Sequence, residues 1–278
     1  MPLASVDHGN IWMFKSLDEF ASLFDRHGGT DHGYLARHYQ RFCVTQAEFL
    51  STWDMARGKR VLDIGAHWLH QALLWRQAGF ELTAVDLPVT LELANVRALA
   101  AAHDIRLVPC ADLESARALE AIADSSIDVL LFTEIIEHLT FNPVAMWKQI
   151  HRILARGGRI VITTPNYYAW NGRMWNPGRF LSGFGGGISV DEILSTHTYG
   201  HHWREFSRRE LVRYFCLLSP DFNTIKWITM RDYYPPRADG RYRLRQRVYE
   251  MIPGLRPNLH IEMELPRKDA GIRIEPGW

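Results

Sequence analysis

The sequence predicts an α/β protein built on a doubly wound, mostly parallel β-sheet. Three short apolar segments, 60–64, 82–85 and 127–132, have the length and composition of strands, and segments with apolar residues at helical spacing lie between them. Strands that alternate with helices pair in parallel, because each helix returns the chain to the same edge of the sheet. The segment 127–132 is apolar except for Asp128, which indicates a strand buried on both faces.

The expected elements run from a helical N-terminal region to a final strand. Up to about residue 57 we expect amphipathic helix, because apolar side chains recur there at roughly helical spacing, at Leu35, Tyr39, Phe42, Phe49 and Leu50. After the first strand we expect helices at 69–78, 88–102, 142–154 and 207–218, and further strands at 105–108, 159–163, 224–230 and 258–265. Gly79 closes the first of these helices, and Asn142 with Pro143 begins the third.

The bulk composition indicates one globular domain. We expect a single domain over residues 1–278, with a helical cap at 1–57, a cofactor-binding core at 58–166 and substrate-side insertions at 167–278. The 32 basic residues balance 31 acidic ones, which argues against a long nucleic acid as partner. Three scattered cysteines suggest neither a disulfide framework nor a metal knuckle. With no signal-peptide pattern and no apolar run of bilayer length, we expect a cytoplasmic protein without membrane contact.

Acidic residues and a glycine stand where the predicted strands end. Doubly wound sheets bind ligands beyond the carboxyl ends of their strands. Asp63 and Gly65 lie at the end of the first strand, Asp86 ends the second, and Asp112 follows the third. A glycine lets the backbone approach a ligand closely, and the N-terminus of the next helix offers N–H groups to a carboxylate. Asp86 is placed to accept hydrogen bonds from both hydroxyls of a ribose.

These segments resemble the motifs of class I S-adenosylmethionine-dependent methyltransferases. "VLDIGAHWLH", "AVDLP" and "CADLE" resemble the first three motifs, and "DVLLFTEIIEHL" followed by "LARGGRIVITTPN" resembles the fourth and fifth strands. The resemblance covers roughly 59–166 and implies a seven-stranded Rossmann-like methyltransferase sheet, here with an N-terminal helical lid and insertions after strands five and six. His67 and Leu69 stand where this family usually has glycines, which leaves the path of the loop open. The resemblance implies S-adenosylmethionine contacts from Asp63, Gly65, His67, Asp86, Leu87, Asp112, Leu113 and Thr133.

The segment "TEIIEHL" places two carboxylates and an imidazole just beyond the fourth strand. If it is helical, Glu134, Glu137 and His138 face one way, and such ligands suit Mg²⁺ or Mn²⁺. The later stretch from His202 to Arg208 resembles the "H-x-x-E-aromatic-S/T-R" sequence of small-RNA 3′-terminal 2′-O-methyltransferases. That resemblance implies a Mg²⁺ site made of Glu134, Glu137, His138 and His202, with His201 as the substitute ligand.

A metal-free interpretation stays open beside this one. Similar "E-x-x-E-H-L" segments occur in relatives such as quinone O-methyltransferases, where Glu134 would orient the cofactor amine and His138 would be a buried histidine. Without a metal, a general base must take the hydroxyl proton. The candidate catalytic residues are then His197, His201 and His202. A catalytically inactive cofactor-binding module is a further alternative, because the usual glycine pattern is broken.

We expect metal-assisted methylation of a hydroxyl, with a sugar or glycoside as the acceptor. A mannoside of a polysaccharide precursor is given as one example of such an acceptor, although no single residue specifies it. An RNA 2′-O-methyltransferase and a metal-free enzyme for a quinone or small aromatic are the alternatives. Aromatic residues of the insertion are expected to form a stacking wall or plain core: Tyr167, Tyr168, Trp170, Trp175 and Trp203. Alternating arginines are expected in a strand or loose turn, binding phosphate, a homodimer partner or solvent: Arg237, Arg241, Arg243, Arg245 and Arg247.

Overall fold

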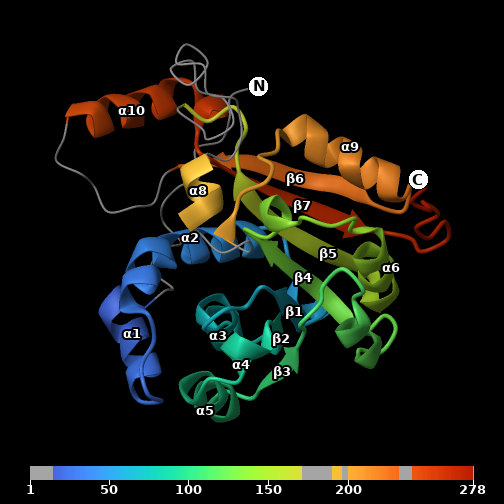
Figure 1. Cartoon of the computed structure of the whole chain (residues 1–278), viewed down its shortest axis with the longest axis horizontal. Coiled ribbons are helices and arrows are strands. Elements are labelled where there is room, and N and C mark those ends of the chain that lie inside the picture. The colour runs from blue at the N-terminus through green and yellow to red at the C-terminus, as the bar shows by residue number, and fades with distance from the viewer. Residues whose placement is uncertain (1–14, 171–189, 196–199, 232–239, 278) are drawn as a thin grey trace.

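The computed structural model describes residues 15–170, 190–195, 200–231 and 240–277, which form a seven-stranded sheet covered by helices on both faces (Figure 1). The strand order is β3-β2-β1-β4-β5-β7-β6. The first five strands in this order are parallel, and β7 runs antiparallel between β5 and β6. The predicted mostly parallel, doubly wound sheet is therefore confirmed.

The strands lie close to where the hydrophobic pattern places them. They are β1 (Arg60–Ile64), β2 (Glu81–Asp86), β3 (Ile105–Pro109), β4 (Ile127–Thr133), β5 (Leu154–Pro165), β6 (Asn223–Met230) and β7 (Asn258–Leu265). The α-helices are α1 (Leu17–Asp25), α2 (His32–Leu50), α3 (His70–Gln77), α4 (Pro88–Leu91), α5 (Ala94–Ala102), α6 (Val144–Ile153), α8 (Val190–Ser195), α9 (Arg208–Leu218) and α10 (Gly240–Met251). Short 3₁₀ turns add η2 (Met55–Arg57), η3 (Arg117–Ala121), η4 (Ile136–His138) and η6 (Pro253–Leu255).

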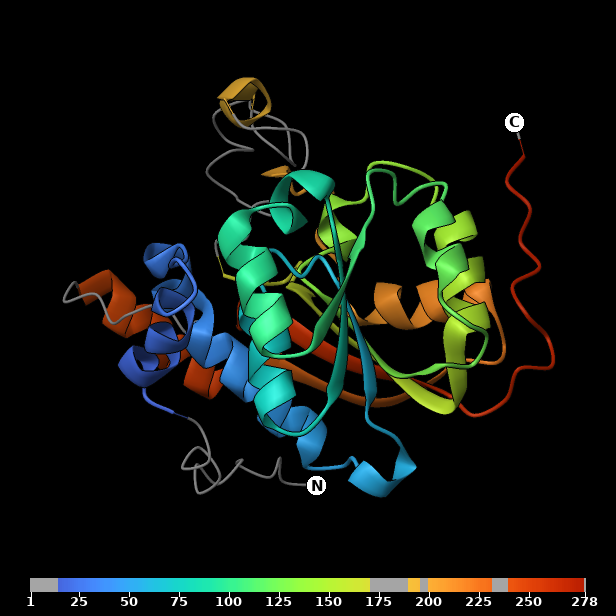
Figure 2. The ribbon, with the colours of Figure 1, turned by 90° about the horizontal axis from the view of Figure 1, so that it is seen from below.

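Two hydrophobic cores hold the sheet between its helical layers. One core joins α1, α2, α3 and α5 to one face, and the other joins η3, α6 and α9 to the opposite face (Figure 2). Neighbouring residues of a strand point to opposite faces, so Val129 and Leu131 of β4 enter the first core while Leu130 and Phe132 enter the second. Burial on both faces explains the nearly continuous apolar sequence of this strand.

The N-terminal helices pack on the first face and begin with well-formed caps. Ser16 and Glu19 form a reciprocal capping box at α1, and Asp31 accepts a hydrogen bond from the Tyr34 N–H at the start of α2. Phe42 and Phe49 lie on the buried side of α2, as the helical spacing predicts. The first half of α2 also reaches the carboxyl ends of the strands, where Arg41 pairs with Glu134, the residue after β4.

Two expectations about helices were wrong. The segment 88–102 is two helices, because Leu93 adopts an extended conformation between α4 and α5. The break lets Leu91 and Val96 both enter the core, which a continuous helix would prevent at a spacing of five residues. The arginine-rich segment forms the helix α10 rather than a strand or loose turn, with Val248 and Tyr249 buried. No helix in the described part of the chain is both long and apolar enough to cross a bilayer.

Candidate cofactor and catalytic site

The loop after β1 follows a path that normally requires glycine. Gly65, His67 and Leu69 all have positive φ, at 81°, 50° and 66°. For His67 and Leu69 this left-handed conformation costs about 1–2 kcal/mol each, because the Cβ crowds the following carbonyl oxygen. The loop therefore keeps the conformation expected of glycines in spite of its two larger side chains. Strain of this kind is retained where the surrounding structure holds the backbone for a function.

Gly65 is also required by its neighbour Ile135, which follows β4. A Cβ added to Gly65 would lie 2.1 Å from Ile135 Cδ1 and 2.9 Å from Ile135 Cγ1, far inside normal contact. The tips of β1 and β4 are thus packed closely together. This contact places the loop after β1 beside the segment "TEIIEHL" that follows β4.

Asp86 fixes the loop after β1. Its Oδ2 accepts a hydrogen bond of 2.7 Å from the His67 N–H, and its Oδ1 accepts one of 2.6 Å from the Leu87 N–H. A carboxylate has about four acceptor positions, so both oxygens keep capacity for a ligand hydroxyl. Asp86 therefore ends β2 and positions the loop that lies beside it, while its contact with a ribose stays a prediction.

Asp112 and Leu113 follow β3 at the same edge of the sheet. The Cys110 N–H donates to the Asp86 carbonyl oxygen at 2.8 Å, which brings the end of β3 next to the end of β2. Asp112 is exposed, and its Oδ1 accepts hydrogen bonds from the N–H groups of Glu114 and Ser115. Hydrogen bonds from Ser115 hold the pKa of Asp112 below its usual value. Gly65, Asp86 and Asp112 thus follow three neighbouring strands, as the sequence predicts.

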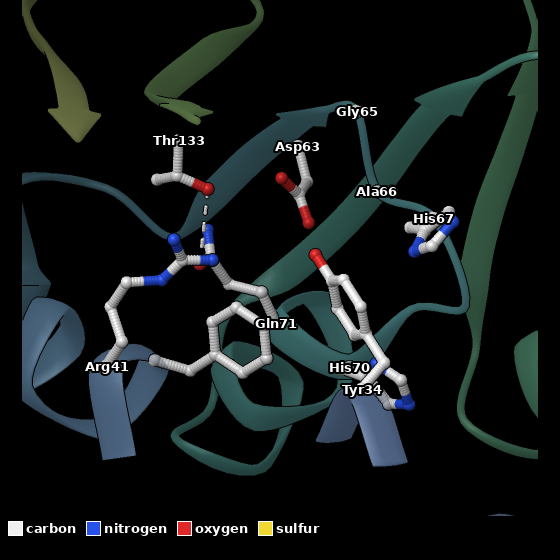
Figure 3. Close-up of a pocket in the computed structure, with 10 residues that line it drawn as sticks. Tyr34, Arg41, Asp63, Gly65, Ala66, His67, His70, Gln71 and Thr133 are labelled. Atoms are coloured by element: carbon white, nitrogen blue, oxygen red, sulfur yellow. Dashed lines mark hydrogen bonds between the residues drawn. The ribbon is translucent and has the colours of Figure 1, made fainter. Parts of the chain in front are cut away.

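A pocket lies between the loop after β1 and helix α2 (Figure 3). From the sheet side it is lined by the predicted Asp63, Gly65, His67 and Thr133, and the Thr133 hydroxyl donates to Gln71 Oε1 at 3.3 Å. The remaining lining residues, from α2, the loop and α3, were not predicted: Tyr34, Arg41, Phe42, Ala66, His70 and Gln71. The pocket thus lies at the methionine end expected for the cofactor, and α2 forms its outer wall.

Asp63 is a buried carboxyl group in this pocket. It is 2% exposed, and its Oδ2 has no hydrogen-bond partner among the described residues. Burial, and secondarily the negative charge of Asp86, raises the pKa of Asp63 to about 8. A buried polar atom without a partner carries a desolvation cost, so this oxygen is available for a donor group of a ligand.

Glu134 does not lie where the sequence placed it. The condition for one shared face, a helical "TEIIEHL" segment, is not met, because Glu134 has a φ of 55° and only Ile136–His138 forms a single 3₁₀ turn. Its Oε2 instead forms an ion pair of 2.8 Å with Arg41 Nη1 on α2. Glu134 is consequently not part of the cluster of potential metal ligands found among the described residues.

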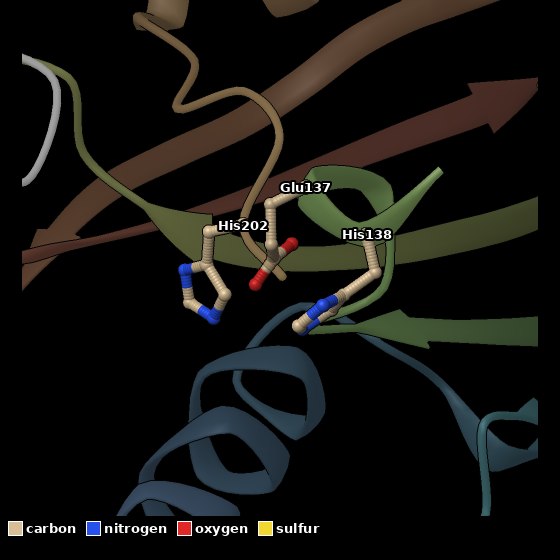
Figure 4. Close-up of side chains that lie close together, drawn as sticks. All are labelled: Glu137, His138 and His202. Carbon is tan, nitrogen blue, oxygen red and sulfur yellow. The ribbon is translucent and has the colours of Figure 1, made fainter. Parts of the chain in front are cut away.

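The other three predicted ligands come together. Donor atoms of Glu137, His138 and His202 all lie within 4.8 Å of one another (Figure 4). The rings of His138 and His202 meet edge to face, with centroids 4.6 Å apart. The backbone N–H of Trp203 donates to the Glu137 carbonyl oxygen at 2.9 Å, which connects the segment before α9 to the segment after β4. Residues more than sixty positions apart thus form one acidic and imidazole-rich site.

Glu137 is the most deeply buried member of this cluster. It is fully buried, its Oε2 accepts a 3.0 Å hydrogen bond from the Thr164 hydroxyl, and its Oε1 has no hydrogen-bond partner among the described residues. Burial, and next the nearby charge of Glu134, raises the pKa of Glu137 well above its usual value. A cation bound at this position would compensate the charge that burial otherwise disfavours.

The structure assigns His201 a backbone role. Its carbonyl oxygen lies 3.0 Å from His138 Nδ1, and because a carbonyl only accepts, Nδ1 carries the hydrogen. His138 Nε2 is then the nitrogen with a lone pair for a ligand. The buried ring of His201 is not one of the three gathered groups, so its expected use as substitute ligand is not supported.

Most of the stretch after His202 has structural roles. Phe206 is in the hydrophobic core, Ser207 caps α9 through a capping box with Glu210, and the Arg208 guanidinium lies 4.0 Å from the Trp227 ring centroid. His202 alone of this stretch reaches the cluster. His197, Trp175 and Arg237 lie outside the described residues, as does the side chain of Arg241.

Comparison with protein families decides the class. A family model described as a methyltransferase domain matches residues 35–216, more than half of the chain. The chain belongs to the methyltransferase-domain family. This match and the sheet topology confirm the predicted class, an S-adenosylmethionine-dependent methyltransferase of class I. No curated protein sequence matches this methyltransferase.

Solved structures share the fold of the methyltransferase at low sequence identity. The methyltransferase of a Haloferax volcanii complex with the Trm112 activator has a TM-score of 0.57 at 16% identity, covering 91% of this chain and 98% of that one. An S-adenosylmethionine-dependent methyltransferase of Mesorhizobium loti scores 0.55 at 15% identity, with 82% and 98% covered. The Burkholderia thailandensis 1,6-didemethyltoxoflavin-N1-methyltransferase, with bound S-adenosylhomocysteine, scores 0.53 at 18% identity, with 96% and 93% covered. These likenesses show the fold, and they leave the acceptor open.

Proposed function

We propose that this methyltransferase transfers the methyl group of S-adenosylmethionine to a hydroxyl of a sugar or glycoside, assisted by a divalent metal ion. The observation that carries the proposal is the cluster of Glu137, His138 and His202 beside the cofactor pocket. In the proposed cofactor site, Asp86 and Leu87 bind the ribose side, Asp112 and Leu113 the adenine, and the loop at Gly65 and His67 the methionine end. Asp63 and Thr133 line the same end.

The donor set fits a divalent ion. Two imidazoles and one carboxylate form three ligands that leave coordination positions open for a substrate, as in catalytic rather than structural metal sites. Glu137 Oε1 is buried without a hydrogen-bond partner among the described residues, and the His201 carbonyl orients the His138 ring through Nδ1. Because Mg²⁺ prefers oxygen ligands and imidazole suits later metals, this set favours Mn²⁺ over Mg²⁺.

The residues of the cluster would position a hydroxyl for methyl transfer. When bound, a divalent ion lowers the pKa of a coordinated hydroxyl and fixes its direction. Glu137 and His138 hold the ligand position next to the strand tips, and His202 approaches from the segment before α9. Without a metal, the half-buried His202 would instead be the candidate to take the hydroxyl proton. Burial of Glu137 beside Thr164 keeps the acidic side of the site away from water.

An exposed aromatic ring next to the cluster supports a sugar acceptor. Trp203 directly follows His202, its backbone N–H donates to the Glu137 carbonyl oxygen, and its side chain is 40% exposed. Large exposed rings close to a reacting site stack on the apolar face of a sugar. The near-neutral charge of the chain gives no general attraction for a polyanion, so an RNA acceptor is less well supported.

Metal binding tests the proposal directly. Titration of Mn²⁺, followed by its electron paramagnetic resonance signal, should show one site in the wild-type protein. Glu137→Gln and His202→Ala should each remove that site. His103→Ala is the control, because His103 precedes β3 and lies at the opposite edge of the sheet from the strand tips.

An acceptor screen completes the test. Glycosides, RNA 3′ ends and quinols are offered with labelled S-adenosylmethionine, with Mn²⁺ or with EDTA. Methylation of a glycoside only with Mn²⁺ supports the proposal. Undiminished turnover in EDTA contradicts the metal role, and transfer to RNA or a quinol contradicts the proposed acceptor.

A further inference from the structure

Helix α10 is held against the end of β6 by its inner side. Tyr249 is 2% exposed, and its carbonyl oxygen accepts a 3.1 Å hydrogen bond from the Arg256 guanidinium. The same guanidinium donates to the Thr229 carbonyl oxygen of β6 at 3.2 Å. Glu250 forms an ion pair of 3.6 Å with Arg231, which follows β6. These contacts fix the orientation of α10 relative to the sheet and thereby define which of its faces points outward.

The outward face of α10 combines arginines with exposed apolar side chains. Arg243, Arg247 and Met251 follow one another at intervals of four residues, and Leu244 precedes Met251 by seven, so the four share one side of the helix. Both arginines are exposed, and Leu244 and Met251 are 58% and 72% exposed. Ile252, directly after the helix, is 51% exposed. Single exposed apolar residues are ordinary, whereas a group of them on one face indicates an interaction site.

The basic charge of the chain is concentrated at this helix. Its 12 residues contain four arginines and one glutamate, whereas the whole chain balances 32 basic with 31 acidic residues. Arginine binds phosphate groups well, because its planar fork of donors matches their oxygens. The neighbouring apolar side chains gain free energy only where they leave water. A partner that offers phosphate groups next to hydrocarbon satisfies both requirements, and an anionic lipid bilayer is such a partner.

We infer that α10 binds along the surface of an anionic membrane. Arg243 and Arg247 bind lipid phosphates, and Leu244 and Met251 enter the boundary between headgroups and acyl chains. The helix lies at the margin of the molecule in both views, away from α6 and α9, where a flat surface can reach it (Figure 1, Figure 2). This inference goes beyond the proposed function and does not depend on it.

Surface binding is compatible with the length of α10. A helix of 12 residues cannot span a bilayer, which requires about 20. The sequence-based expectation of no membrane contact rested on the lack of a signal peptide and of a spanning segment, and neither concerns a helix that lies on the surface. A nucleic acid would also attract the arginines, but it would leave Leu244 and Met251 in water, so the apolar residues favour the membrane.

Sedimentation with lipid vesicles tests the inference on the wild-type protein. Vesicles of phosphatidylglycerol and phosphatidylcholine in equal parts are compared with vesicles of phosphatidylcholine alone, at about 0.1 M salt. The protein should bind the anionic vesicles at least about tenfold more tightly, because each arginine near an anionic surface contributes about fivefold. Salt at about 0.5 M should reduce this preference, because it screens the charges. The comparison requires no variant and is therefore independent of folding.

Two double variants then assign the binding to α10. Arg243→Gln with Arg247→Gln should lower the affinity for anionic vesicles about 10- to 30-fold. Leu244→Gln with Met251→Gln should lower it about 5- to 10-fold although the charge is unchanged, because less apolar surface leaves water. All four positions are exposed, so the circular dichroism spectrum and the melting temperature should stay close to those of the wild type.

A second arginine pair is the matched control. Arg97→Gln with Arg106→Gln removes the same charge from exposed residues of α5 and β3, and β3 is the edge of the sheet opposite to β6. This control should keep the wild-type affinity for anionic vesicles. If it loses as much affinity as the α10 arginine variant, only the net charge matters and α10 is not the binding site.

Other results would also overturn the inference. Equal binding to both kinds of vesicle, or binding to neither, excludes an anionic membrane as the partner. If the Leu244 and Met251 variant binds anionic vesicles like the wild type and single-stranded RNA displaces them, the arginines bind a nucleic acid. If that variant converts a dimer to a monomer in analytical ultracentrifugation, a second copy of the chain covers the helix. None of these measurements involves methyl transfer, so the proposed function is tested separately.

Discussion

Gly65→Ala tests whether the tips of β1 and β4 are packed as tightly as the structure indicates. A left-handed φ of 81° costs alanine about 1 kcal/mol or more, because the added Cβ crowds the backbone. The same Cβ would lie 2.1 Å from Ile135 Cδ1 and force a rearrangement, which costs about 1–3 kcal/mol in a packed interior. Together the free energy of unfolding should fall by about 2–4 kcal/mol.

A matched glycine separates the two costs. Gly157 has a φ of 78°, but a Cβ there would meet nothing closer than Arg57 Nη2 at 3.7 Å. Gly157→Ala should therefore show the backbone cost alone, and urea denaturation should place Gly65→Ala about 1–3 kcal/mol below it. Ile135→Val removes the clashing Cδ1, so the double variant with Gly65→Ala should be more stable than the sum of the single effects. Equal destabilisation at Gly65 and Gly157 would refute the close contact.

Three further changes probe the site and its supports. Asp86→Ala should weaken binding of S-adenosylhomocysteine about 100-fold by calorimetry, because it removes the proposed ribose acceptor and frees the His67 N–H; an unchanged affinity would contradict the assignment. Asp63 keeps its proton up to about pH 8 in the folded protein, whereas the unfolded chain releases it near pH 3.8, so the wild-type free energy of unfolding falls as pH rises between these values. Asp63→Asn should remove that slope, and its stability advantage over the wild type should grow from pH 4 to pH 8 to at most ~5 kcal/mol; parallel pH profiles would argue against a raised pKa. Ser207→Ala should lower the free energy of unfolding by about 1 kcal/mol, because α9 loses its cap, and should leave the Mn²⁺ affinity unchanged. If the variant lost the Mn²⁺ site, Ser207 would have a role beyond capping.

Local patterns were sufficient for most of the sheet. The ranges 60–64 and 258–265 agree with β1 and β7 at both ends, since alternation, apolar runs and flanking breakers depend only on neighbouring residues. Sequence patterns failed where packing against the sheet decides the structure. The predicted helix 88–102 is broken at Leu93, because the break depends on which side chains the core accepts. The alternating arginines of α10 resemble a strand, although the segment is a helix.

The sequence predicted the site residues at the ends of the strands, and it missed the pocket residues that α2 contributes. Arg41 was missed because nothing near it in the sequence indicates that α2 passes over the carboxyl ends of the strands. One signal was present: Tyr34, His38 and Arg41 form a polar stripe at helical spacing beside the apolar one. Such a stripe is more commonly solvent-exposed, and only the packing of α2 on the sheet shows that it faces a pocket.

The sequence by itself determined the class of this protein, because Gly65, Asp86 and Asp112 follow successive strands and a parallel sheet brings all strand ends to one edge. The tertiary structure alone decided how the acidic residues after β4 are divided. One backbone angle turns Glu134 toward Arg41 on α2, while Glu137 and His138 meet His202 from the segment before α9. Spacing in the chain determines which residues share an element, whereas the partner of a side chain depends on which distant element packs against it.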